Sequence, residues 1–152
     1  MKQLHSKKVL TILIFLTLAV IWGHSLLGRE ASSEESGFVM KLLAPLLEVI
    51  VGKGNVTEHL VRKLAHFCEF FVFGAELLLF FTLSKNRKDA FLLALSHGLF
   101  TALVDETIQI FSGRGPMIPD IWLDFSGVTV GALLVFAVTA LKMHKRQRFS
   151  QK

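Results

Sequence analysis

The sequence predicts an all-α integral membrane protein, a bundle of four transmembrane helices with one external interfacial helix. Two observations support this class: 52% of the 152 residues are hydrophobic, and Phe and Leu concentrate in long runs rather than at alternating positions. A soluble domain of this size would need far more polar surface. The length suits one domain, so we expect a single membrane domain over residues 1–152.

The first predicted span covers about residues 9–27, a bilayer's length of apolar residues behind a basic start. A basic head before an apolar core is also the pattern of a cleaved signal peptide. The following residues 28–32, Gly-Arg-Glu-Ala-Ser, offer no convincing small-x-small cleavage site. This favours a retained helix.

An interfacial helix is predicted next, over about residues 38–51. Residues 29–37 are rich in Ser and Glu, which indicates a solvated loop before it. The apolar stretch contains Pro45 and only Lys41 and Glu48 as charges, and it is too short to cross a bilayer. We therefore expect it to lie on the membrane surface.

Three further spans are predicted at about residues 58–84, 90–111 and 118–141. A short charged loop, residues 85–89, separates the first two of these. The sequence Ser-Gly-Arg-Gly-Pro at 112–116, rich in helix breakers, predicts the turn before the last span.

The basic residues predict the orientation. Four spans place both termini on one side, and that side carries 11 of the 17 Lys and Arg residues but only one acid, Asp89. By the positive-inside rule both termini are cytoplasmic, and the loops around Glu34 and Arg114 are external. The net charge of +5 therefore reflects topology, and we expect the lipid bilayer, not nucleic acid, as the partner.

Charged side chains near the external ends of three spans form the candidate site. Such groups are costly in hydrocarbon, usually face a bundle interior, and mark function. Glu69 lies roughly 10 Å below Arg62, and Asp105 roughly 14 Å below Arg114, at 1.5 Å of rise per residue. Gly127 continues the face of the fourth span that carries the acids, and Gly131 follows it, which allows close helix approach. The predicted members are Arg62, Lys63, His66, Glu69, Asp105, Glu106, Gln109, Arg114, Asp120 and Asp124.

The charges in this set do not balance. Three basic residues face five acidic ones, which leaves −2 when His66 is neutral. A buried negative excess must be protonated, hydrated or bound to a cation. A purely structural ion network remains the alternative, but such a network would more naturally be balanced.

Two chemistries fit these residues. The carboxylates and His66 could hold a divalent metal that polarises a phosphoryl or carbonyl oxygen. Alternatively, basic groups could grip a phosphate while His66 or Glu69 moves protons. The candidate catalytic residues are His66, Glu69, Asp105, Glu106, Asp120 and Asp124. The candidate substrate-binding residues are Arg62, Lys63, Gln109 and Arg114.

Four spaced motifs together resemble the VanZ-like family. They are Arg-Lys-x-Ala-His-Phe-x-Glu-Phe at 62–70, Asp-Glu-x-x-Gln at 105–109, Gly-Arg at 113–114, and Asp-x-x-x-Asp-x-x-Gly at 120–127. The resemblance runs from about Trp22 to Gly131. Ser112 stands where the family pattern has proline, a departure confined to the turn.

The resemblance implies a multipass protein of the bacterial plasma membrane. The family takes its name from a protein associated with low-level resistance to teicoplanin, a lipid-bearing glycopeptide, and no biochemical activity is established for it. It thus implies a role in the cell envelope, with a lipoglycopeptide or a lipid-linked envelope precursor as partner. Whether the protein is a hydrolase or transferase acting on a lipid-linked phosphate, a binding protein or a structural protein stays open.

Overall fold

The computed structural model describes residues 2–115 and 117–150. This part of the chain forms five helices and no strand, which confirms the all-α prediction. The helices are α1 (Lys2–Leu26), α2 (Arg29–Val51), α3 (Glu58–Thr82), α4 (Arg87–Phe111) and α5 (Ile118–Ser150).

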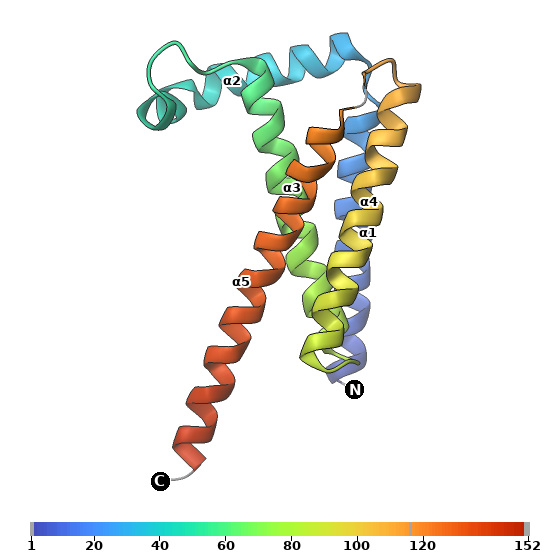
Figure 1. The fold of residues 1–152 in the computed structure, drawn as a ribbon, viewed down its shortest axis with the longest axis vertical. Helices are drawn as coiled ribbons and strands as arrows, with labels where there is room; N and C mark the ends of the chain where they lie inside the picture. Colours follow the sequence, from blue (N-terminus) through green and yellow to red (C-terminus); the bar gives the residue numbers. More distant parts are fainter. Residues whose placement is uncertain (1, 116, 151–152) are drawn as a thin grey trace.

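Four of the helices are long and apolar enough to cross a membrane: Gln3–Leu26, Glu58–Thr82, Arg87–Phe111 and Ile118–Lys142. They match the four predicted spans, with ends displaced by a few residues. Figure 1 shows α2 lying across one end of these four helices, while α1 begins and α5 ends toward the opposite end. A surface helix on the side away from both termini is the arrangement that four spans predict.

The helix α2 begins at Arg29, so the predicted loop over residues 29–37 is wrong. Glu30 in the first turn is favourable at the positive end of the helix dipole. Ser32 and Ser36, one turn apart, are 5% and 7% exposed, so they form a buried face of α2. The Ser33 hydroxyl, 2.5 Å from Glu58 Oε2, joins α2 to the start of α3.

The helices α3 and α5 touch through their backbones. A Cβ atom at Gly131 would lie 2.0 Å from the Phe71 carbonyl oxygen, and one at Gly74 would lie 2.2 Å from the Val128 carbonyl oxygen. A Cβ at Gly127 would be 2.6 Å from the Phe67 carbonyl oxygen. The predicted close approach along Gly127 and Gly131 is confirmed.

The first span is an integral part of the bundle. Ile21 of α1 is fully buried in the same hydrophobic cluster as Phe70 and Phe73 of α3 and Ala102 of α4. The helix α1 packs against both α3 and α4. This packing brings the polar end of α1 to the same level as the predicted site.

Candidate functional site

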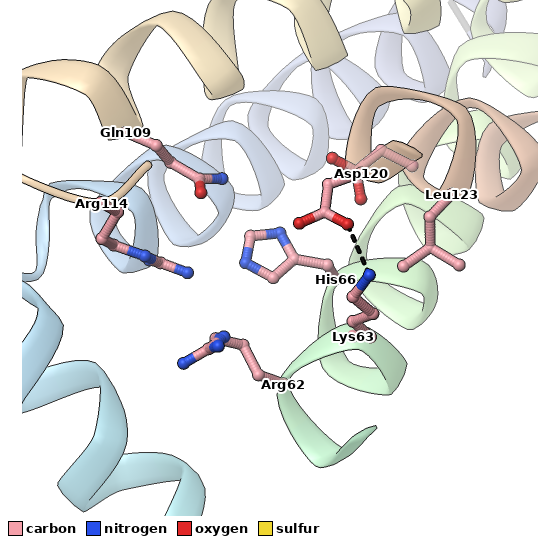
Figure 2. A pocket seen from close by; sticks show the side chains of 8 residues that line it. Arg62, Lys63, His66, Gln109, Arg114, Asp120 and Leu123 are labelled. Atoms are coloured by element: carbon pink, nitrogen blue, oxygen red, sulfur yellow. Dashed lines mark ion pairs between the residues drawn. The ribbon is translucent and has the colours of Figure 1, made fainter. Parts of the chain in front are cut away.

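A small polar pocket lies at the α2 end of the bundle, between α3, α4 and α5. Its volume of about 20 Å³ is enough for one water-sized group, which needs roughly 10–15 Å³. Figure 2 shows Arg62, His66 and Arg114 around it. Seven of the ten predicted residues line the pocket together with Leu123: Arg62, Lys63, His66, Gln109, Arg114, Asp120 and Asp124.

One ion pair closes the α3–α5 side of this pocket. Lys63 Nζ lies 2.7 Å from Asp120 Oδ1, and the two side chains are 29% and 25% exposed. Figure 2 marks the pair with a dashed line. It ties the first turn of α5 to α3, so Asp120 is already neutralised within the protein.

Asp105 is fully buried and held from two helices. Its Oδ1 accepts a 2.7 Å hydrogen bond from the Ser25 hydroxyl of α1, and its Oδ2 accepts a 2.9 Å bond from Gln109 Nε2 one turn later in α4. His66 Nδ1 lies 3.9 Å from Asp105 Oδ2, too far for a hydrogen bond. The carboxylate is thus fixed in orientation beside the imidazole.

A second carboxylate completes a cluster of possible metal ligands. One ligand atom each from His66, Asp105 and Asp124 lies within 4.8 Å of the others, and all three residues are buried. Asp124 is 1% exposed, and its Oδ1 has no hydrogen-bond partner within residues 2–115 and 117–150. The three residues come from α3, α4 and α5.

Two guanidinium groups, those of Arg62 and Arg114, line the pocket. Arg114 Nη1 donates to the His24 carbonyl oxygen at 3.1 Å, and Arg62 Nη2 lies 3.2 Å from His59 Nδ1. Within the described chain, neither group is within 4.0 Å of a carboxylate oxygen. Burial, and after it the charge of Arg62, lower the pKa of Arg114, but a guanidinium remains protonated. Two unpaired positive groups at one opening favour an anion.

These two arginines also border two neighbouring spaces. An outer pocket of about 530 Å³ is lined by Arg62 and Arg114 together with Ser33, Glu58 and other residues. A side pocket of about 110 Å³ beneath α2 is lined by the same two arginines and by His66, with His24, Glu35 and Glu69 among others. A ligand in any of the three pockets would therefore meet both guanidinium groups.

Three predicted catalytic residues, Asp105, Glu69 and Glu106, do not line the small pocket beside His66. Asp105 lies behind it, held by Ser25 and Gln109. Glu69 Oε1 lies 2.7 Å from His24 Nδ1, and the carboxylate faces the side pocket beneath α2. Glu106 Oε2 accepts a 3.0 Å hydrogen bond from the Met117 backbone N–H at the entry to α5. The carboxylates of Glu69 and Glu106 therefore interact with neighbouring segments instead of the small pocket.

The sequence analysis missed the contribution of α1. His24 contacts Glu69 and, through Nε2 at 3.4 Å, Glu35, while Ser25 bonds to Asp105. The available signal was a pair of polar residues at the C-terminal end of an otherwise apolar span.

These features define a multipass membrane protein with a polar site at one end of its helical bundle. A VanZ/LLP1 family model matches residues 9–140, and the chain belongs to this family. The match covers nearly all of the four spans and every residue of the site, from His24 to Asp124. Neither a curated protein nor a solved structure matches the chain.

Proposed function

We propose that this protein binds the phosphate of a lipid-linked envelope component at the outer face of the bacterial plasma membrane, and that it thereby lowers susceptibility to teicoplanin-type glycopeptides. The observation that carries the proposal is the pair Arg62 and Arg114, two guanidinium groups without a carboxylate partner in the described chain, both facing an opening of about 530 Å³. Guanidinium groups bind phosphate by strong, charge-assisted hydrogen bonds.

The expected orientation supports an external site. The basic residues of the N-terminus, the α3–α4 loop and the end of α5 favour the cytoplasm, which leaves the α2 end outside. The exposed apolar side chains of α2, among them Phe38, Leu42 and Leu46, suit a helix at the level of the lipid headgroups. A lipid phosphate lies at the same level.

A second candidate function is hydrolysis or transfer at that phosphate. The position of His66 favours it, because the imidazole borders the small pocket beside the two arginines. In this version water or an acceptor hydroxyl loses a proton to His66 and attacks phosphorus, and the departing oxygen takes up the proton.

The phosphate proposal is tested in a deletion strain complemented with wild type, Arg62→Gln or Arg114→Gln. Teicoplanin and vancomycin susceptibility and membrane abundance are measured together. We expect both variants to reach normal abundance and to lose the teicoplanin effect. Lys53→Gln, which removes an exposed external charge away from the three pockets, is the matched control and retains it. Arginine variants that protect as well as wild type would refute the proposal.

Phosphate release from a lipid-linked phosphate by the purified protein separates the two versions. Catalysis requires release by wild type and its loss in His66→Ala, with lipid binding kept. A binding protein retains the lipid and releases no phosphate.

A further inference from the structure

We propose that His66, Asp105 and Asp124 together bind one divalent transition-metal ion inside the bundle. One imidazole nitrogen and two carboxylate oxygens form a donor set suited to Zn²⁺, and also to Mn²⁺. Because the ion would lie at the same pocket, this inference rests on the proposed function and deepens it, but it depends on residues other than Arg62 and Arg114. With the ion bound, His66 would be a ligand and not the proton acceptor of the hydrolytic version.

The spacing of the ligand atoms is close to what an ion requires. Two tetrahedral ligands of one ion, each at ~2.1 Å from it, lie ~3.4 Å apart. His66 Nδ1 and Asp105 Oδ2 are 3.9 Å apart. The largest separation in the cluster is 4.8 Å or less, so the ligand atoms need to approach one another by no more than ~1.4 Å.

The unpaired oxygen of Asp124 is the second argument. The side chain is 1% exposed and borders the small pocket, and its Oδ1 has no partner in the described chain. A buried carboxylate oxygen without a partner is costly, and a metal ion would satisfy it directly.

Asp105 has the outer hydrogen bonds typical of a metal-binding carboxylate. Ser25 and Gln109 donate to its two oxygens and fix its orientation. Each carboxylate oxygen has a second lone pair, so both hydrogen bonds can persist with an ion bound.

The charge partners of the candidate carboxylates indicate the same three residues. Asp120 is neutralised by Lys63, Glu69 contacts His24, and Glu106 accepts from the Met117 backbone. Asp105 and Asp124 have no basic partner other than the imidazole of His66 in the described chain. A divalent cation would balance their two charges and leave Arg62 and Arg114 available for an anion.

The remaining coordination position would face the pocket. His66 and Asp124 both line the space of about 20 Å³, which holds one water-sized group. A water or a single oxygen of an anion bound by the arginines would fit there. A metal site with an open position is the arrangement found in catalytic rather than structural zinc sites.

The test uses the full chain purified in detergent, stripped with a chelator and reloaded separately with Zn²⁺, Mn²⁺ or Mg²⁺. We expect about one ion per chain by elemental analysis and a higher Tm after reloading with the preferred ion. Reloading with Co²⁺ should give a visible ligand-field spectrum. His66→Ala and Asp124→Asn should lose the ion and the spectrum.

Two more variants keep the test decisive if a ligand variant fails to fold. Gln109→Ala removes a hydrogen bond to Asp105 but no ligand, and it should weaken metal binding roughly 10- to 100-fold. Glu76→Gln, which removes a carboxylate of the same helix α3 outside the cluster, should bind like wild type.

The inference is wrong if wild type neither retains nor regains any of the ions, or if His66→Ala and Asp124→Asn bind them unchanged. The outcome is separable from that of the phosphate proposal. Metal binding by wild type together with normal resistance in the arginine variants would support the metal site and refute the phosphate site. Absence of metal binding together with lost resistance in the arginine variants would refute the metal site and support the phosphate site.

Discussion

Ser25 in α1 donates a 2.7 Å hydrogen bond to Asp105 in α4, and neither residue is exposed. The bond joins the first membrane span to the centre of the candidate site, 80 residues later in the chain. The first span is therefore more than an anchor, because it supplies a group that orients a buried carboxylate.

We expect Ser25→Ala to lower the free energy of unfolding by about 1–3 kcal/mol, because a buried acceptor loses its donor. The measurement is the Tm in detergent. Ser96→Ala is the matched control, since its exposed hydroxyl donates only to the Leu92 carbonyl of its own helix. An equal Tm change in both variants would show that the Ser25 bond is not important for stability.

Gly131→Ala should destabilise the bundle by about 1–3 kcal/mol or more, because the new methyl group would meet the Phe71 carbonyl oxygen at 2.0 Å. Gly23→Ala is the control, with no atom within 4 Å of the new Cβ, and it should be neutral or gain about 0.5–1 kcal/mol of helix stability. Thermal melting of both variants checks this. A Gly131→Ala protein as stable as wild type would contradict the close α3–α5 contact.

Removing either charge of the Lys63–Asp120 pair should cost about 1–3 kcal/mol, since the remaining group is left half-buried without its partner. The exchanged variant, Lys63→Asp with Asp120→Lys, should recover most of that loss in Tm. It should not recover the teicoplanin effect if the sign of the charge at each position matters to the ligand. An exchange that recovers both would make the pair purely structural.

The exposed apolar residues of α2 predict its depth in the membrane. In a Cys68→Ser background, a spin label at Leu46→Cys should be reached by oxygen dissolved in the lipid, because Leu46 lies on the stripe with Phe38 and Leu42. A label at Lys41→Cys, on the charged face, should be reached by a water-soluble relaxation agent. Equal exposure of both labels to water would place α2 away from the bilayer.

The sequence predicts the spans well and the contacts between them less well. Four apolar runs long enough for a bilayer can be found directly, and the glycines at 127 and 131 identify the face of α5 that approaches another helix. The periodicity that places Glu69 and His66 on one side of α3 does not indicate which neighbour each one meets. Glu69 turned out to face His24 of α1, and His66 to face Asp105 of α4.

The first half of α2 was missed for a different physical reason. Ser and Glu indicate solvent by composition, yet Ser32 and Ser36 are buried because their small side chains let the helix pack closely against the bundle. The signal for a helix was the spacing of the small residues Ser32 and Ser36, one helical turn apart. The high content of Ser and Glu does not reveal this spacing. His24 and Ser25 were likewise inconspicuous as two polar residues at the end of a long apolar run.

The size of the pocket beside His66 has a consequence for selectivity. A space of about 20 Å³ admits a water or an ion. The imidazole also borders the side pocket beneath α2, but Asp124 borders the small space alone, and Asp105 borders none of the three pockets. The bundle would thus discriminate by depth, accepting larger groups near Arg62 and Arg114 while allowing only the smallest to touch Asp124.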